Sequence, residues 1–113
     1  MNEFKELLTL LEKFRDEREW DKFHDSKNLA LALSIEAAEL NELFLWKKDS
    51  ESEQVDQEKL KDELADVFAY AIMLAGRHGF EVSEIVKNKI AKNAKKYPVD
   101  LCKGISDKYD NFS

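Results

Sequence analysis

Two apolar stretches decide the fold of this chain. Residues 29–46 read LALALSIEAAELNELFLW, and residues 57–77 read QEKLKDELADVFAYAIMLAGR. Apolar side chains recur at intervals of three and four residues on several sides of both stretches. This predicts helices over residues 28–47 and 57–77 that are apolar nearly all round. Such helices must be covered on every side, so we expect an all-α four-helix bundle completed by homo-oligomerisation, as a dimer or a tetramer.

Amphipathic segments lie on either side of this pair. Residues 3–18 repeat apolar side chains at i, i+3, i+4 and i+7, which predicts a first helix. A fourth helix is predicted from about Ser83 to Lys96. It must stop before Pro98, because the residue before a proline disfavours helical geometry.

The connections between the predicted helices are polar. Residues 20–28 read WDKFHDSKN and break the apolar pattern, and Asp25 or Ser26 would cap the helix that follows. Residues 47–57 read KKDSESEQVDQ and show no apolar period, which predicts a solvated loop.

Length and composition exclude several classes of function. The 113 residues suffice for one domain, which we place at residues 1–100, with a polar tail at residues 101–113. Acidic residues outnumber basic ones by 24 to 18. Duplex binders carry a basic excess instead, so no polynucleotide partner is expected. The single cysteine, Cys102, excludes an internal disulfide and a thiolate zinc site.

The sequence also indicates where the chain resides. Its N-terminus is charged and periodic, unlike a secretory signal. The stretch 29–46 is too short and too acidic to span a membrane, since it contains three glutamates. We therefore expect a cytoplasmic protein with no membrane partner.

Two pairs of carboxylates interrupt the apolar faces of the two central helices. At about 100° per residue, Glu36 and Glu39 lie on the stripe that ends at Trp46. Glu63 and Asp66 lie on the equivalent stripe of the next helix. Both stripes are expected to be buried, and an ionised carboxylate in such a place must be paired or must bind a metal.

If the two stripes face each other, their four carboxylates need relief from mutual repulsion. Charges about 5 Å apart make six pairs of about 3 kcal/mol each at an effective dielectric near 20. Their sum exceeds the stability of about 5–15 kcal/mol that a whole domain has. Protonation or a divalent cation must relieve that cost, and an all-oxygen donor set favours Mg²⁺ or Mn²⁺. The alternative is that one pair faces solvent or meets lysines.

The predicted fourth helix supplies positive charge. Lys89, Asn93 and Lys96 recur at i, i+4 and i+7 and so share one side. Lysines and an amide beside a metal site would suit phosphate oxygens. The same lysines are equally explained by the preference of cations for the C-terminal end of a helix.

Three blocks of sequence, taken in order, resemble one known family. The first is WDKFHDSKNL at residues 20–29, the second pairs EAAE at 36–39 with ELAD at 63–66, and the third is KIAKNAKKYP at 89–98. Together they resemble the all-α MazG-like nucleotide pyrophosphohydrolases. The Trp-x-x-Phe-His segment and the Trp-Lys after the first acidic helix resemble the dCTP pyrophosphatase-like branch. The resemblance covers about residues 10–98.

The resemblance implies an activity and a set of site residues. It implies a house-cleaning enzyme of the nucleotide pool that hydrolyses a nucleoside triphosphate between its α- and β-phosphates, giving the monophosphate and pyrophosphate. The implied substrate is dCTP or a related pyrimidine deoxynucleotide. The residues that would hold Mg²⁺, one of them orienting the attacking water, are Glu36, Glu39, Glu63 and Asp66. Those that would contact the phosphate chain are Lys89, Asn93, Lys96 and Tyr97. The candidates for the base pocket are Trp20, His24 and Trp46.

The assignment of base-pocket residues has the most alternatives, because this sequence departs from the branch's pattern there and simpler structural roles also explain these residues. The segment 25–27 reads Asp-Ser-Lys where the branch often has Thr-Pro-Arg, which leaves the preferred base open. Ordinary core packing explains Trp20 and Trp46 equally well, and stabilisation of a loop explains His24. His78 lies at a predicted helix end, and we interpret it as a cap residue.

Three other functions compete with this hypothesis. A non-catalytic helical interaction protein would pair its acids with lysines across an oligomer interface. A phosphoribosyl-ATP pyrophosphohydrolase would make the same cleavage, but the Trp-x-x-Phe-His block favours the dCTP-like branch. A di-iron carboxylate bundle is disfavoured because no histidine stands three residues after a glutamate.

Overall fold

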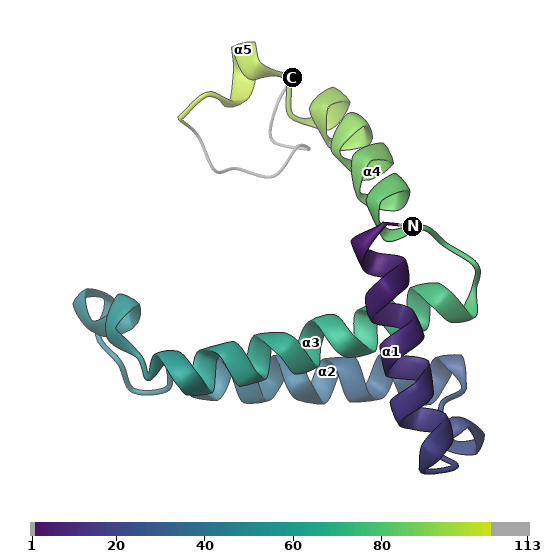
Figure 1. Ribbon diagram of the computed structural model, residues 1–113. Coiled ribbons are helices and arrows are strands. Elements are labelled where there is room, and N and C mark those ends of the chain that lie inside the picture. Colours follow the sequence, from purple (N-terminus) through teal and green to yellow (C-terminus); the bar gives the residue numbers. More distant parts are fainter. Residues whose placement is uncertain (1, 105–113) are drawn as a thin grey trace. The chain divides into compact units, whose positions relative to one another are not determined.

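The structure, a computed structural model, describes residues 2–104, and all of its regular secondary structure in that range is helical (Figure 1). The predicted all-α class is therefore confirmed for this range. No helix in it is both long and apolar enough to cross a bilayer. The elements are α1 (Glu3–Glu17), the 3₁₀ helix η1 (Asp21–Phe23), α2 (Ser26–Glu42), the 3₁₀ helix η2 (Asp49–Gln54), α3 (Gln57–Arg77), α4 (Val82–Lys96) and α5 (Val99–Cys102).

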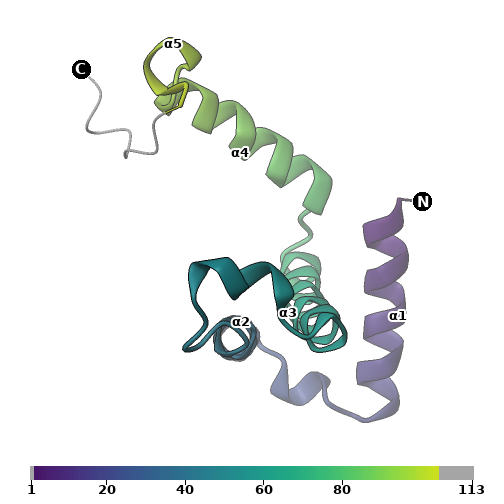
Figure 2. The same cartoon turned by 90° about the vertical axis from the view of Figure 1, so that its left-hand side faces the viewer.

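The chain forms two compact units, residues 1–80 (unit 1) and residues 81–113 (unit 2). In unit 1, α2 and α3 pack side by side as a helical hairpin. The first helix, α1, crosses α3 on the side away from α2 (Figures 1 and 2). Over residues 2–104, the buried apolar residues all belong to unit 1. They are Leu29, Val55, Ile72, Met73 and Ala75.

Side-chain caps start the three helices of unit 1. The Asp25 carboxylate accepts the Asn28 N–H at 2.8 Å, so Asp25 is the N-cap of α2, one of the two caps that the sequence predicted. The Asp56 carboxylate accepts two backbone N–H groups at the start of α3. The Asn2 side chain accepts the Lys5 N–H at 2.9 Å and caps α1. Each cap satisfies donors that a helix leaves open at its N-terminus.

A glycine lets α1 approach α3 closely. A Cβ added to Gly76 would lie only 2.6 Å from a methyl carbon of Leu8. Real Cβ atoms do not come so close to another carbon, so the crossing of α1 over α3 requires the missing side chain at Gly76.

The end of α3 is a Schellman motif with glycine at its left-handed position. Phe80 N–H donates to Ala75 O at 2.9 Å, and Gly79 N–H donates to Gly76 O at 3.1 Å. Gly79 has φ = 71°, which glycine adopts without a steric penalty. His78 is the C-cap, as the sequence predicted, and its Nε2 lies 2.8 Å from the hydroxyl of Ser26 at the start of α2.

The end of α1 has the same hydrogen bonds but no glycine. Trp20 N–H donates to Arg15 O, and Glu19 N–H donates to Asp16 O, both at 3.1 Å. Glu19 has φ = 55° and occupies the left-handed position that glycine usually takes. The Trp20 ring packs edge-on against Phe14, with ring centroids 5.9 Å apart. This contact matches the apolar one that often closes a Schellman motif.

The predicted C-terminal end of the second helix is wrong. We expected a helix over residues 28–47 with Trp46 on its stripe, but α2 ends at Glu42. After it, Phe44 N–H and Leu45 N–H bond to carbonyls three residues back, which tightens the chain into turns. Trp46 then has φ = 64° and is 91% exposed, so it lies outside the helix.

The loop predicted over residues 47–57 is more ordered than expected. Residues 49–54 form η2, and Val55 is buried with 5% of its surface exposed. Val55 is the one apolar residue in that polar run, and its burial fixes the connection to α3.

The two central helices are less covered than the sequence predicted. In α2, Leu29 is buried whereas Leu31 and Ile35 are exposed. In α3, Leu64 and Phe68 are likewise exposed. Apolar side chains therefore remain on the surface of the hairpin.

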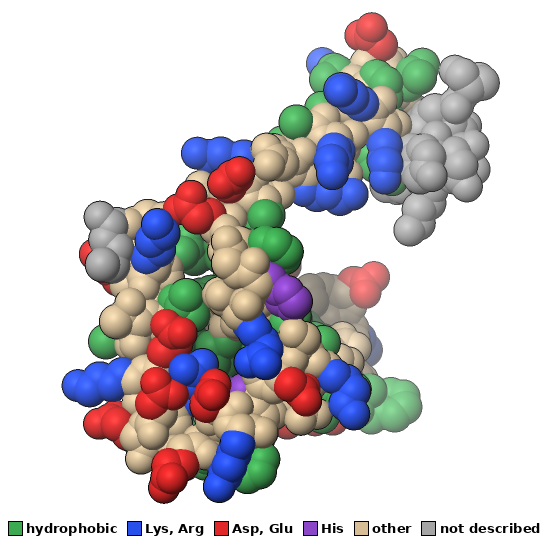
Figure 3. Space-filling view, turned by 90° about the vertical axis from the view of Figure 1, so that its right-hand side faces the viewer, with side chains coloured by type: hydrophobic (Ala, Val, Ile, Leu, Met, Phe, Trp, Pro, Cys, Tyr) green, Lys and Arg blue, Asp and Glu red, His purple; other side chains and the backbone are tan. Residues whose placement is uncertain are grey.

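Unit 2 contains α4 and α5. The fourth helix, α4, spans Val82–Lys96 and ends before Pro98 as predicted, and basic side chains follow it along its length (Figure 3). The first part of the predicted polar tail instead completes the short helix α5. The rest of that tail, residues 105–113, lies outside the described residues.

Candidate functional site

Three carboxylates from α2 and α3 come together on the helical hairpin. Glu36 and Glu39 lie one turn apart on α2, and Glu63 lies on α3. One oxygen of each residue is within 4.8 Å of an oxygen of the other two. The i, i+3 spacing puts the two α2 residues on one side of that helix, and the packing of α2 against α3 brings Glu63 to them.

These carboxylates are less buried than the sequence predicted. Glu36 and Glu63 are half-buried, whereas Glu39 and Asp66 are exposed, so none belongs to the core. However, one oxygen of Glu36 and one of Glu63, the Oε2 atom in each, are buried. Neither has a hydrogen-bond partner in the described part of the chain. Each half-buried glutamate thus turns one oxygen into the protein and away from water.

Burial and like charge disfavour ionisation in this cluster. Burial, a hydrogen bond with Glu39 and the negative charges of Glu39, Asp66 and Glu63 raise the pKa of Glu36 from 4.5 to about 7. Burial and the charge of Glu39 are the largest causes that raise the pKa of Glu63 above its ordinary value. The charge of Asp66 raises the pKa of both glutamates, so Asp66 lies near the cluster without belonging to the three-carboxylate set.

The donor set fits a hard divalent cation. It consists of carboxylate oxygens alone, which Mg²⁺ and Mn²⁺ prefer over softer ligands. The two buried oxygens without partners are the groups that an ion would satisfy. The residues that would hold the ion are therefore Glu36, Glu39 and Glu63.

A cavity of about 240 Å³ lies within unit 1, and Asp66 is the acidic residue that lines it. Its lining also includes two residues predicted for the base pocket, Trp20 and His24. The His24 ring meets the Tyr70 ring edge-on, with centroids 6.3 Å apart. The Nδ1 atom of His24 is buried and has no hydrogen-bond partner in the described part of the chain. The wall residues are Leu11, Phe14, Arg15, Trp20, His24, Asp66, Ala69, Tyr70 and Met73.

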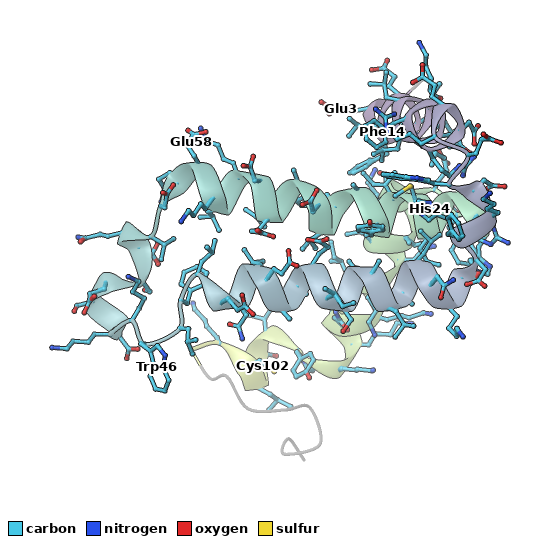
Figure 4. The ribbon with its side chains drawn as sticks, turned by 90° about the horizontal axis from the view of Figure 1, so that it is seen from below. Glu3, Phe14, His24, Trp46, Glu58 and Cys102 are labelled. Atoms are coloured by element: carbon cyan, nitrogen blue, oxygen red, sulfur yellow. The ribbon has the colours of Figure 1, made fainter. Side chains whose placement is uncertain are left out.

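Trp46 is not brought to this cavity. It follows the C-terminal end of α2, whereas His24 precedes the N-terminal end, and Figure 4 shows the two at opposite ends of that helix. The 17 residues of α2 span about 25 Å at 1.5 Å per residue. Within one chain, Trp46 and His24 therefore cannot contact the same base.

The four residues predicted to contact phosphate lie in unit 2, three of them on α4 and the fourth directly after it. Lys89 and Lys96 are exposed, and Asn93 and Tyr97 are half-buried. Asn93 O accepts the Tyr97 N–H at 2.8 Å, which places Tyr97 as the C-cap of α4.

Sequence reasoning missed the roles of Tyr70 and Arg15 in the cavity wall. Tyr70 had a usable signal, because it follows Asp66 by four residues on the acidic side of α3. Burial and the charges of Glu36 and Asp66 raise the pKa of its hydroxyl. Arg15 had no signal, since it stands among many charged residues at the end of α1.

Comparisons with known proteins agree on one family. The sequence model of the MazG-like family matches residues 31–112. The chain is 38% identical to dCTP pyrophosphatase 1 of Rattus norvegicus over 105 residues, which are 88% of this chain and 62% of the relative. For the Homo sapiens protein of the same name, the identity is 38% over 102 residues, 86% of this chain and 60% of the relative. The chain thus spans less than two thirds of the length of these relatives.

A solved structure is similar over almost its whole length. The crystal structure of a pyrophosphatase from Archaeoglobus fulgidus superposes with a TM-score of 0.80 and 40% sequence identity. The match covers 87% of this chain and 94% of that one.

Proposed function

The chain belongs to the MazG-like family, and we propose that it hydrolyses a nucleoside triphosphate between the α- and β-phosphates. The products are the nucleoside monophosphate and pyrophosphate. The observation that carries this proposal is the cluster of Glu36, Glu39 and Glu63, with one oxygen of each within 4.8 Å of the others. The names of the similar proteins, dCTP pyrophosphatase 1 and a pyrophosphatase, support the same reaction.

Each acidic residue has a role in this proposal. Glu36, Glu39 and Glu63 hold Mg²⁺, with Mn²⁺ as an alternative. When bound, the cation neutralises phosphate charge and polarises the α-phosphorus. Asp66 lies outside the three-carboxylate set and is our candidate for the residue that orients the attacking water and accepts its proton. The water oxygen bonds to the α-phosphorus, and the bond to the bridging oxygen breaks as pyrophosphate leaves.

Residues of α4 would neutralise the leaving pyrophosphate. Lys89 and Lys96 offer ammonium donors, and Asn93 and Tyr97 offer an amide and a hydroxyl, all of which suit phosphate oxygens. Stabilising the charge that develops on the leaving group accelerates phosphoryl chemistry.

The cavity next to Asp66 would hold the nucleoside. It has aromatic walls from Trp20 and His24, and aromatic faces stack on nucleobases. Because the cavity reaches Asp66, a base bound there would leave the α-phosphate close to the acidic cluster. We propose dCTP or a related pyrimidine deoxynucleotide as the substrate, consistent with the names of the relatives. A cytoplasmic location is part of the proposal, since the nucleotide pool is found there.

The exposed apolar residues of the hairpin support a homodimer or homotetramer. Leu31 and Ile35 on α2 and Phe68 on α3 are each more than half exposed. A second copy of the chain would cover them, since large apolar surfaces of soluble proteins usually mark an interface. Light scattering after size exclusion tests this, and Ile35→Lys is expected to reduce the mass to that of a smaller assembly. A monomeric wild-type chain would contradict it.

A nucleotide panel tests the reaction. The full chain is incubated with each ribo- and deoxyribonucleoside triphosphate, with Mg²⁺ or with EDTA, and pyrophosphate and orthophosphate are measured separately. We expect pyrophosphate and the monophosphate, with pyrimidine deoxynucleotides preferred, and no turnover in EDTA. Orthophosphate as the first product would contradict the cleavage position, and no product from any nucleotide would contradict the activity.

Variants test the site assignment in the same assay. Glu36→Gln and Asp66→Asn are expected to abolish turnover while leaving the helical circular dichroism intact. Glu53→Gln, in η2, is the matched control, because Glu53 is exposed and outside the cluster. Normal turnover by either site variant would refute the assignment.

A further inference from the structure

The cavity next to Asp66 has one basic wall residue, Arg15, to which the proposed reaction gives no role. Arg15 lies in the last turn of α1, and only 18% of its side chain is exposed. It shares the cavity wall with Trp20 and His24. Its contacts decide whether it binds the substrate or holds the wall.

The Arg15 guanidinium is surrounded by carboxylates of the chain itself. Its Nε donates to Asp16 Oδ1 at 2.9 Å, its Nη1 lies 3.4 Å from Asp21 Oδ1, and its Nη2 lies 4.0 Å from Glu12 Oε2. All three nitrogens therefore face acidic groups. Three carboxylates outweigh one guanidinium charge and would repel an incoming phosphate, so Arg15 is not an anion-binding residue.

The contact with Asp21 joins two elements. Asp21 is the first residue of η1, so the ion pair ties the last turn of α1 to the short helix that follows. The main chain makes a second tie one residue earlier, where Trp20 N–H donates to Arg15 O at 3.1 Å. The loop that both ties close contains Glu19 in the left-handed region, a conformation that a glutamate does not favour by itself. The turn therefore depends on its contacts.

The segment held in this way carries the aromatic wall of the cavity. Trp20 precedes η1 and His24 follows it. With three residues, η1 is too short to be stable alone. On its other side, Asn28 Nδ2 donates to Phe23 O at 3.1 Å and ties η1 to α2. Arg15 provides the corresponding tie to α1.

From this geometry we infer that Arg15 is a positioning residue for the nucleoside. The Arg15 side chain holds η1 through its ion pair with Asp21, and the Arg15 main-chain carbonyl accepts the Trp20 N–H. These contacts keep Trp20 and His24 in place for the base, and Arg15 does not touch the reacting atoms. The inference rests on the proposed function in assigning the cavity to the nucleoside. It predicts that losing the ion pair weakens binding of the base and leaves the phosphate chemistry unchanged.

Kinetics provide the first test. Arg15→Met and Asp21→Asn each remove the side-chain ion pair between α1 and η1, and both leave the main-chain hydrogen bond from Trp20 to Arg15 in place. Lys13→Met is the matched control on α1, where Lys13 is exposed. With the best nucleotide of the panel, we expect both variants to raise KM about threefold, as a loss of about 0.6 kcal/mol would give. kcat should stay within about twofold, because the lost interaction acts on binding alone. With 2-deoxyribose 5-triphosphate, which lacks a base, KM should be unchanged.

Tryptophan fluorescence provides a second test that needs no activity. In a Trp46→Phe background, Trp20 is the one remaining tryptophan, and 43% of it is exposed in the structure. Acrylamide should quench Trp20 more strongly in Arg15→Met and Asp21→Asn than in the Lys13→Met control. Arg15→Lys keeps the charge but loses the fork that reaches several carboxylates, so we expect an intermediate value. Partly exposed ion pairs contribute little to global stability, so all variants should fold.

The outcomes separate this inference from the proposed function. If the wild type hydrolyses no nucleotide, the proposed function fails, and the quenching of Trp20 still decides whether Arg15 holds the wall. Unchanged quenching in both variants overturns the inference. An equal rise in KM for the base-free triphosphate also overturns it, because Arg15 would then act on the phosphate side. A fall in kcat at constant KM in these variants would overturn the inference as well.

Discussion

Replacing Glu36 with glutamine should stabilise the metal-free protein while removing its response to Mg²⁺. In the folded chain the Glu36 carboxylate lies with one oxygen within 4.8 Å of both Glu39 and Glu63. At that distance the like charges repel each other, although solvent screens the repulsion at this partly exposed site. Glutamine has nearly the same shape and carries no charge, so it removes two of the three repulsive pairs in this set.

The raised pKa gives the magnitude and the pH window. A carboxyl whose pKa rises from 4.5 in the unfolded chain to about 7 in the folded one holds its proton more tightly when folded. The metal-free protein therefore loses stability as the pH rises from about 4.5 to about 7. The full shift corresponds to about 3 kcal/mol, and solvent screening at this half-exposed site reduces it to about 1–2 kcal/mol. For a domain of this size, that raises Tm by roughly 5–10 °C.

The assay is thermal unfolding followed by circular dichroism at pH 5.5 and pH 8, in EDTA and in Mg²⁺. We expect Glu36→Gln to raise Tm in EDTA at pH 8 and to raise it less at pH 5.5, where Glu36 of the wild type is already protonated. Mg²⁺ should raise Tm for the wild type and not for the variant. The control is Glu42→Gln on the same helix, an exposed residue that should change Tm equally at both pH values. A lower Tm for Glu36→Gln at pH 8, or an equal gain at both pH values, would refute the reasoning.

Further variants test the fold around the site. Glu19→Gly should stabilise the protein by about 0.5–1 kcal/mol in urea unfolding, because glycine adopts the φ of 55° found there without strain; Gly79→Ala, at φ = 71°, should do the opposite. A loss of stability in Glu19→Gly would contradict the assignment of Glu19 as the left-handed cap. Gly76→Val should cost about 1–3 kcal/mol through its clash with Leu8, and Leu8→Ala in the same chain should recover part of that loss. Asp25→Ala should cost about 1 kcal/mol by removing the N-cap of α2, and an unchanged urea midpoint would show that the cap contributes nothing.

The helices were predictable wherever local chemistry marks both ends. For α3, the sequence predicts residues 57–77, and the structure has those bounds. Asp56 stands directly before the first helical residue, and Gly79 stands two residues after the last one, Arg77. Both act through hydrogen bonds or backbone angles of their own neighbourhood, so the sequence carries the signal.

The end of α2 was not predictable in the same way. Apolar residues continue through Phe44-Leu45-Trp46, so the helical pattern persists after the helix has ended at Glu42. Neither a glycine nor a proline marks that end. The chain turns there through i, i+3 hydrogen bonds and a positive φ at Trp46, which hydrophobic spacing does not encode.

Which residues form the acidic cluster was more predictable from the sequence than how deeply they are buried. The i, i+3 pairs on two adjacent helices predicted a cluster of four carboxylates. Glu36, Glu39 and Glu63 do meet, whereas Asp66 lies outside this three-carboxylate set. Spacing says nothing about how far a side chain lies from solvent, so Glu39 and Asp66 were expected to be buried and are exposed. The ion pair between Arg15 and Asp21 spans a turn whose shape no local sequence pattern predicts.

The helical hairpin of α2 and α3 has a consequence for how the chain folds. These helices follow one another in the sequence with only residues 43–56, including η2, between them. The entropy cost of closing a loop grows slowly with its length, so we expect their pairing early in folding. The pairing also brings Glu63 against Glu36 and Glu39. We therefore expect repulsion among these groups to slow folding when they are ionised. Refolding in EDTA, followed by stopped-flow circular dichroism, should slow as the pH rises from 5.5 to 8, and Mg²⁺ should restore the rate. A refolding rate that changes with neither pH nor Mg²⁺ would show that the cluster assembles after the rate-limiting step.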